Sequence, residues 1–262
     1  MTRYFRLWFK LIKLSLMEGF EYRANVLLHI LAKLLWTALT LIFFEVIYLH
    51  TDEIVGWNKS EVLILFGTFL VVRALFAAFF YDGPSTLPRL IQTGRLDLLL
   101  AKPVSSQFTI SVCETDVGDL ARLFLGAFLV LHSFGDLGIT VGIGQMITYL
   151  LLIPASVMTF YSLYFMVLTT SIWLVRLDNA GEVINTIIFL GKFPVSVFPK
   201  TVSFLLTFVF PIAFAGTVPA EVLLGRVSWP LVFYGFGISV VLLRLSHRFW
   251  NFALKRYTSA GG

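Results

Sequence analysis

The sequence has few charged residues and almost no cysteine. Of its 262 residues, 13% are charged, whereas a soluble domain usually carries about a quarter. Its single cysteine, Cys113, excludes an internal disulfide and a cysteine-rich metal cluster. Apolar residues make up 58% of the chain, more than a soluble core of this size could bury. A soluble enzyme, a disulfide-stabilised secreted domain and a disordered chain are therefore excluded.

The motifs of nucleotide hydrolysis and of metal catalysis are also missing. The only Gly-Lys pair, Gly191-Lys192, has Thr186 where a phosphate loop needs its first glycine and Phe193 where it needs Ser or Thr. The histidines form no paired metal-ligand spacing. We therefore expect no metal, no cofactor and no enzymatic activity in this chain. The histidines fall on four different segments, as His29, His50, His132 and His247.

Long apolar runs dominate the sequence instead. A helix that spans a bilayer needs roughly 20 mostly apolar residues, and five runs are long enough. A sixth span is expected within 183–218, where three prolines interrupt the pattern, with 183–199 forming a helix near the inner surface that leads into it. The six predicted spans are 26–49, 62–81, 117–135, 146–175, 200–216 and 229–249.

Basic residues gather at the two ends of the chain. The positive-inside rule places both ends in the cytoplasm, which requires an even number of spans. The net charge of +5 then reflects membrane orientation rather than nucleic-acid binding. We expect a multi-pass protein of the cytoplasmic membrane, with loop 82–116 and tail 250–262 also cytoplasmic. The terminal basic residues are Arg3, Arg6, Lys10, Lys13 and Arg23 at one end, and Arg244, Arg248, Lys255 and Arg256 at the other.

The first segment, 1–24, has an amphipathic pattern. Its basic residues from Arg3 to Lys13 recur every three or four positions, so they share one helix face, with Phe5, Trp8 and Phe9 opposite. Lys10 and Lys13 also interrupt what would be the apolar region of a signal peptide. We expect an interfacial helix that either links the first span to a cytoplasmic partner or anchors its orientation.

Four ionisable residues fall inside the predicted spans: Lys33, Glu45, Arg73 and Arg122. Charge at membrane depth is costly, so such groups normally face protein or water. Arg73 is the deepest and is the strongest functional candidate, the alternative being a structural contact between helices. Lys33, Glu45 and Arg122 lie nearer the span ends. Glu45 is the only acid well inside a span, which argues against a proton-driven carrier.

Loop 82–116 is expected to contain short helices. Ser85 can cap the first, with Pro88 in its first turn and Gly94 at its end. A second helix is expected over Leu96–Leu100, ending before Pro103. Its leucines form an apolar face that must be buried either against the protein's own spans or against another chain.

Two stretches resemble motifs of a known family. The run Gly94-Arg95-Leu96-Asp97-Leu98-Leu99-Leu100-Ala101-Lys102-Pro103 is similar to the Gly-x-Leu-Asp-x-Leu-Leu-x-Lys-Pro stretch in one branch of the permease subunits of type-2 ABC exporters. The tail Leu254-Lys255-Arg256-Tyr257-Thr258-Ser259-Ala260-Gly261-Gly262 is similar to the closing motif of that branch. The order of segments along the whole chain also resembles that of these permeases.

The resemblance implies six membrane helices per chain, pairing as a homodimer or heterodimer, and a separate cytoplasmic ATPase that binds ATP and Mg²⁺. The loop between the second and third spans would be the coupling helix, and the amphipathic N-terminal helix would also touch the ATPase. Family members carry short outer helices between the last two spans, and 217–228 leaves room only for a small version. The implied docking residues are Gly94, Arg95, Leu96, Asp97, Leu99, Leu100, Lys102 and Pro103.

We therefore predict an all-α polytopic membrane protein whose 262 residues form one transmembrane domain. Its expected function is that of a permease subunit in an ATP-driven exporter. The aromatic content of 16% suits a lipophilic or amphipathic cargo, although most of these rings are expected to face lipid. The expected partners are an ABC ATPase, a second permease chain and membrane lipid. The alternatives are a secondary carrier driven by an ion gradient and a non-transport membrane scaffold.

Overall fold

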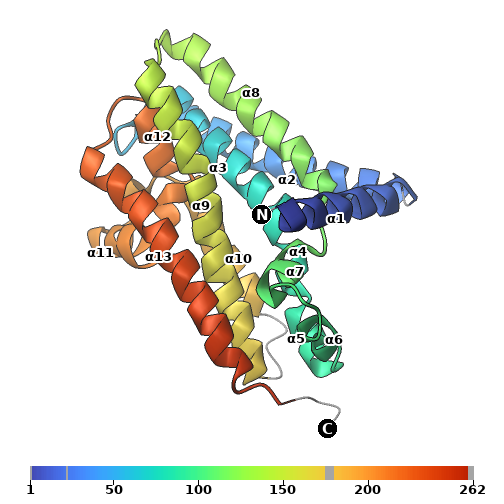
Figure 1. Ribbon diagram of the computed structural model, residues 1–262. Coiled ribbons are helices and arrows are strands. Elements are labelled where there is room, and N and C mark those ends of the chain that lie inside the picture. Colours follow the sequence, from blue (N-terminus) through green and yellow to red (C-terminus); the bar gives the residue numbers. More distant parts are fainter. Residues whose placement is uncertain (1, 22, 175–179, 259–262) are drawn as a thin grey trace.

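The computed structural model describes residues 2–21, 23–174 and 180–258, which fold almost entirely into helices (Figure 1). Within these ranges, five helices are long and apolar enough to cross a membrane, which confirms the all-α polytopic class. They are α2 (Arg23–Tyr48), α3 (Lys59–Phe80), α8 (Leu120–Leu137), α9 (Ile143–Thr169) and α13 (Trp229–Leu254).

Helix α3 forms the centre of the bundle. It packs along α8 on one side and against α9 on the other, while α13 packs along α9. Glycines allow the closest approach, because a Cβ on Gly126 of α8 would lie 2.6 Å from the carbonyl oxygen of Gly67 in α3. Small residues at a helix crossing are typical of membrane bundles. By contrast, α2 lies at the edge of the bundle, and only 11% of its most apolar 18-residue stretch is buried.

The helices start and end at recognisable signals. Asn58 caps α3: its side chain accepts a hydrogen bond from the Glu61 backbone NH, and the Glu61 carboxylate accepts one from the Asn58 NH. Gly138, in the left-handed conformation with φ of 61°, ends α8. Helix α13 continues to Leu254, so the first residues of the predicted tail 250–262 are helical.

A small hairpin follows α2. Strands β1 (Glu53–Ile54) and β2 (Trp57–Asn58) pair antiparallel, and the hydroxyl of Tyr48 donates to the Trp57 carbonyl at 2.8 Å. Val55 and Gly56 both have positive φ, as the tight turn of a two-residue hairpin requires. The hairpin therefore fixes the connection between the first two long helices.

The sixth predicted span, 200–216, is not a single helix. Helix α11 (Lys200–Phe204) continues as a π-helical turn, Leu205–Val209, and the chain then breaks at Pro211. Proline cannot donate a backbone hydrogen bond, so it interrupts the helical ladder. A 3-10 turn, Ile212–Ala215, leads to a further short helix, α12 (Thr217–Leu223).

One further expectation about this region needs correction. The helix expected over 183–199 is only half as long, because α10 (Ala180–Phe189) gives way to turns before Pro194. Helix α12 agrees with the small helical segment for which 217–228 leaves room, and it is buried: the side chains of Val218, Ala220 and Leu223 are at most 1% exposed. The broken segment thus packs into the core against α3 and α9.

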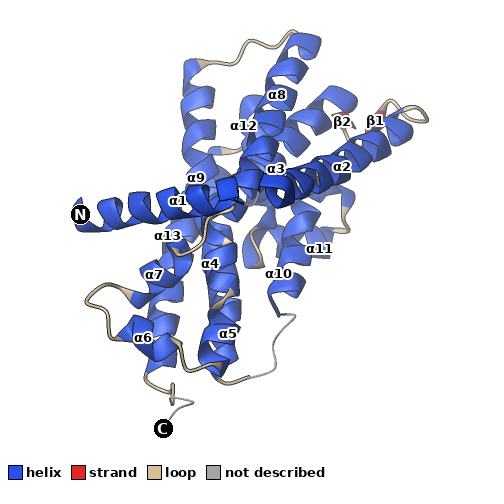
Figure 2. Ribbon diagram, turned by 90° about the vertical axis from the view of Figure 1, so that its right-hand side faces the viewer, coloured by secondary structure: helices blue, strands red, loops and turns tan. Residues whose placement is uncertain are grey.

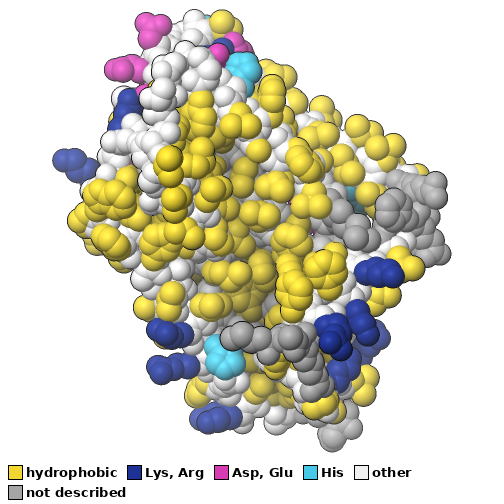
Figure 3. Space-filling view, turned by 45° about the horizontal axis from the view of Figure 1, so that its top comes forward, with side chains coloured by type: hydrophobic (Ala, Val, Ile, Leu, Met, Phe, Trp, Pro, Cys, Tyr) yellow, Lys and Arg dark blue, Asp and Glu magenta, His cyan; other side chains and the backbone are white. Residues whose placement is uncertain are grey.

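Helix α1 (Thr2–Glu21) lies across the long axes of α9 and α13 (Figures 1 and 2). The location of α1 in the membrane interface stays a prediction. A broad apolar band covers one face of the molecule, with acidic side chains toward one end and most of the visible basic side chains toward the other (Figure 3). A membrane protein with a basic cytoplasmic side has this distribution.

Candidate coupling surface and intramembrane polar cluster

Loop 82–116 folds into four short helices that lie together at one end of the molecule (Figure 2). They are α4 (Asp82–Ser85), α5 (Leu87–Gln92), α6 (Leu96–Leu100) and α7 (Ser106–Val112). Gly94, with φ of 67°, turns the chain between α5 and α6. Pro88 lies in the first turn of α5, but Thr86 holds the cap position expected for Ser85, which instead ends α4.

The leucines of α6 do not all face the same way. Leu96 is fully buried within the chain, while Leu99 and Leu100 are half-buried against the core. Leu98, outside the predicted docking set, is 68% exposed. Leu96 therefore stabilises the fold of the loop and is not available to a partner. The exposed residues, here called the coupling surface, are Arg95, Leu98, Ala101, Lys102 and Pro103.

The two stretches that resemble family motifs meet in space. The Asp97 carboxylate of α6 faces the Tyr257 hydroxyl, and burial together with this negative charge raises the pKa of Tyr257. The Tyr257 ring also packs against the core. Tyr257 of the tail thus lies between α6 and the core. Residues 259–262 of the tail motif lie outside the described residues.

Helix α7 is joined to the long helices by side-chain hydrogen bonds centred on Gln107. The Gln107 amide nitrogen donates to the Tyr161 hydroxyl of α9 at 3.1 Å and to the Ser246 hydroxyl of α13 at 3.2 Å. His247 Nδ1 lies 2.9 Å from the Gln107 carbonyl oxygen, so this nitrogen carries the hydrogen. Nearby, Trp250 Nε1 donates to the Ser106 hydroxyl. This Gln107 network makes α7 rigid with respect to α9 and α13.

Helix α1 also touches this region. The Tyr4 ring packs edge-on against Phe108 of α7, with ring centres 5.1 Å apart, and Trp8 packs against Phe79 of α3. Phe5 and Phe9 are more than 60% exposed, so α1 presents aromatic side chains away from the protein. It therefore contacts both α7 and α3 while Phe5 and Phe9 remain exposed.

Arg73 lies in an aromatic pocket inside the bundle. Its guanidinium is within 5.3–5.5 Å of the ring centres of Phe76, Tyr81 and Phe189, and it donates to the amide oxygen of Asn185 in α10. The residue is 5% exposed, and its Nε and Nη1 atoms have no hydrogen-bond partner among the described residues. The two alternatives expected for Arg73, a functional charge and a structural contact between helices, both remain open, because Arg73 contacts α10 while two of its nitrogen atoms lack partners.

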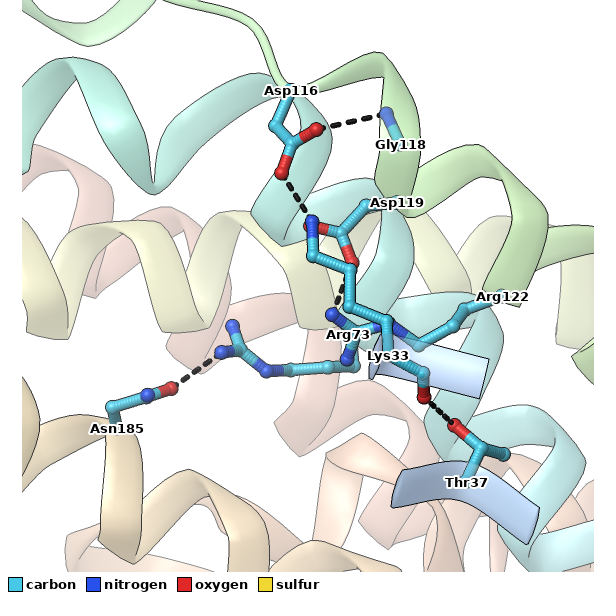
Figure 4. Close-up of polar contacts among 8 residues, drawn as sticks. All are labelled: Lys33, Thr37, Arg73, Asp116, Gly118, Asp119, Arg122 and Asn185. Atoms are coloured by element: carbon cyan, nitrogen blue, oxygen red, sulfur yellow. Dashed lines mark hydrogen bonds and ion pairs between the residues drawn. The ribbon is translucent and has the colours of Figure 1, made fainter. Parts of the chain in front are cut away.

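A second cluster joins α2 to the start of α8 (Figure 4). Lys33 forms ion pairs with Asp116 and, at 2.9 Å, with Asp119. Arg122 pairs with Asp119 one helical turn away. Asp119 is 4% exposed in its side chain and Lys33 19%, so water screens these charges only partly. Lys33 and Arg122 are therefore both held by carboxylates.

Two groups in loop 82–116 have shifted pKa values. Burial, reinforced by the neighbouring Asp116 carboxylate, raises the pKa of Asp82 to about 6, although Lys33 acts in the opposite direction. Burial, reinforced by Glu114, raises the pKa of the Cys113 thiol to about 11. The charge of the Asp82 carboxyl group therefore changes near pH 6.

The far ends of the long helices carry ion pairs of a different kind. Glu45 pairs with Lys59 at 2.7 Å, and both side chains are about half exposed, so this pair contributes little. Glu61 is buried and pairs with Arg226 through both carboxylate oxygens. The Glu61 contact ties the segment after α12 to the start of α3.

Sequence reasoning identified Lys33, Arg73 and Arg122 but not their partners. Asp116 and Asn185 are separated from these residues by 83 and 112 positions, so no local spacing points to them. The three-residue interval from Asp119 to Arg122 is the one available signal, since such a pair meets on a helix face. Among the described residues, no group of three or more His, Cys, Asp or Glu side chains could hold a metal.

Comparison with known proteins agrees with this architecture. The family model described as ABC-2 family transporter protein matches residues 34–261, which includes all five long helices except the first part of α2. A search of curated proteins found no match to the chain. Membership of this family makes the chain a multi-pass permease subunit that works with an ABC ATPase, and not the ATPase itself. The chain therefore belongs to the ABC-2 family of transporter membrane proteins.

Proposed function

We propose that this permease acts in an ATP-driven exporter of lipophilic or amphipathic cargo. Two permease chains form the pathway, and separate ATPase subunits bind ATP and Mg²⁺. The complex lies in the cytoplasmic membrane with both chain ends in the cytoplasm. Movement of the ATPase pair would shift the permease halves as rigid bodies.

The observation that carries this proposal is the coupling surface. It projects Arg95, Leu98 and Lys102 from a loop whose other side is buried. An exposed leucine between two cations suits a groove that is apolar at its centre and acidic at its rim. The Gln107 network connects the same loop to α9 and α13, so a force applied at α6 reaches the long helices.

Dimer formation is supported by the exposed face of α2. Leu28, Leu35 and Trp36 are each more than 60% exposed on this helix. In one chain alone this apolar face would contact only lipid. A second permease chain could cover it, and the pathway would then lie between the two copies.

The test is affinity purification from native membranes in mild detergent, with the co-purifying chains identified by mass spectrometry. We expect an ABC ATPase with the wild-type chain and at least tenfold less of it with Leu98→Asp. Leu49→Asp is the matched control, because Leu49 is 73% exposed but lies at the end of α2 far from the coupling surface. Undiminished ATPase recovery with Leu98→Asp would refute the docking assignment.

The same preparation separates the two alternative functions. A secondary carrier would transport without an ATPase and would stop when the ion gradient collapses. A membrane scaffold would tolerate substitution throughout the coupling surface. Transport that requires ATP hydrolysis and survives loss of the gradient would exclude both.

A further inference from the structure

A lysine with no ion-pair partner among the described residues lies beside a cavity along the second half of α2. The cavity has a volume of about 310 Å³ and is lined by α2 residues from Trp36 to Phe43 together with Lys192 and Phe193. Trp36 is the central residue of the apolar stretch Ala24–Tyr48, so the cavity begins near the middle of the span. The remaining lining residues are Leu39 and Thr40.

Lys192 has no carboxylate partner among the described residues. Its ammonium group lies 5.2 Å from the ring centre of Phe193 and 6.0 Å from that of Phe189. Aromatic faces stabilise a cation only partly, and an ionisable group at membrane depth normally marks a functional site. The Thr40 hydroxyl is neutral and donates to the Trp36 carbonyl of the same helix, so it does not neutralise the lysine.

A second cavity adjoins the first and is lined only by apolar side chains. It has a volume of about 160 Å³ and shares Phe43 and Phe193 with the first cavity. Its remaining walls are entirely apolar and include Ile47 and Ile54. The rings of Phe43 and Phe193 stand edge to face, with centres 6.2 Å apart, and both rings line the two cavities.

We propose that these adjoining cavities bind an anionic amphiphile, with its phosphate or carboxylate at Lys192 and its apolar part between Phe43, Phe193 and Ile47. The proposal rests on the proposed function, because it specifies the charge of the exported cargo. A phospholipid of the bilayer keeps its phosphate at the membrane surface, so an anion held beside residues 36–43, within the apolar stretch Ala24–Tyr48, belongs to a molecule that has entered the permease.

The test measures binding of dodecyl phosphate to the purified full-length complex in phosphatidylcholine nanodiscs. We expect Lys192→Met to raise the Kd at least tenfold and Lys192→Arg to raise it less than threefold. Dodecyl maltoside, which has the same chain without the charge, should bind with no dependence on residue 192. Lys200→Met is the matched control, since Lys200 is exposed in the same segment and does not line the cavity.

Equal binding of dodecyl phosphate to the wild-type chain and Lys192→Met would overturn the proposal. So would competition by phosphatidylglycerol added to the nanodisc, because a bilayer lipid would then be the occupant. A cavity closed by a second permease chain would abolish binding in every variant and would also overturn it. The assay needs no ATP hydrolysis, so loss of ATPase recruitment would count against the proposed function alone.

Discussion

At the scale of single residues, Arg73 combines a buried charge with incomplete hydrogen bonding. A buried charge destabilises a fold unless it is paired and hydrogen-bonded, and no ion pair of Arg73 is present among the described residues. An arginine that leaves two nitrogen atoms without partners would therefore stabilise the fold less than an apolar side chain, so stability alone does not explain it. The contact with Asn185 of α10 indicates a role in the relative position of α3 and α10.

We therefore expect Arg73→Met to leave the thermal unfolding midpoint equal or higher while lowering transport at least tenfold. The measurement pairs a melting curve with a transport assay on the same preparation. Arg73→Lys keeps the charge and should retain part of the transport. Normal transport by Arg73→Met would show that the guanidinium has no functional role.

Asp82 predicts a pH dependence of stability. Its pKa of about 6 lies above the usual value for an aspartate, near 3.9, so ionisation is less favourable in the folded protein than in the unfolded chain. The neutral Asp82 carboxyl group therefore contributes to the free energy of unfolding below about pH 4. This contribution is lost as the pH rises through 6, where the buried group ionises. The groups that face it are Lys33 and the carboxylates of Glu114, Asp116 and Asp119.

The expected result is that Asp82→Asn stabilises the protein at pH 8 by roughly 1–3 kcal/mol, taking about 1.4 kcal/mol for each unit of pKa shift, and has little effect at pH 4. Thermal unfolding of both proteins across this range would measure the difference. A constant difference between pH 4 and 8 would show that the carboxylate is not perturbed in this way.

At the scale of elements, the crossing of α3 and α8 depends on two glycines. A Cβ on Gly126 would lie 2.6 Å from the Gly67 oxygen and 2.9 Å from the Leu70 side chain, so the helices would have to separate. Overpacking of this kind costs about 1–3 kcal/mol. We expect Gly126→Val to lower the melting temperature, whereas Gly135→Val on the same helix, with open space around it, should have little effect. Equal shifts in both variants would contradict the packing account.

The long helices could be predicted from the sequence because each is specified locally. Apolar length alone placed α3 and α9 to within a few residues. The broken segment around Pro211 could not be placed in this way. An apolar run with a proline is compatible with either a kinked span or a break, and the outcome depends on how α3 and α9 cover the freed backbone groups.

The candidate coupling surface could likewise be predicted only where local sequence signals specify the structure. The short helix at 96–100 and the turn at Gly94 follow from local signals, and both are present. Which leucine of α6 faces outward depends on packing against the rest of the loop, so Leu96 could not be recognised as buried. The partners of Lys33 come from a distant segment and could be found only in three dimensions.

At the scale of the whole molecule, α2 and the coupling loop lie in different positions relative to the central helix α3. The loop is held by hydrogen bonds to α9 and α13, and the N-terminal half of α2 is held by the ion pairs of Lys33 with Asp116 and Asp119. The loop is therefore joined both to the bundle and, through Asp116, to its edge helix.

If α2 faces a second copy of this chain, a cysteine on its exposed side should form an intermolecular disulfide. Leu35→Cys, at a position 63% exposed, is expected to give a covalent dimer on mild oxidation in native membranes. Phe124→Cys, at a position 73% exposed on α8, should remain monomeric. Cross-linking at both positions or at neither would argue against a homodimer through α2, and denaturing electrophoresis would distinguish these outcomes.

Cys113 has a practical consequence for such experiments. With a thiol pKa of about 11, roughly one molecule in ten thousand carries the reactive thiolate at pH 7. The native chain therefore already serves as a nearly silent background for site-directed labelling. Fluorophores or spin labels attached to new cysteines could follow the opening and closing of the permease without removal of its own thiol.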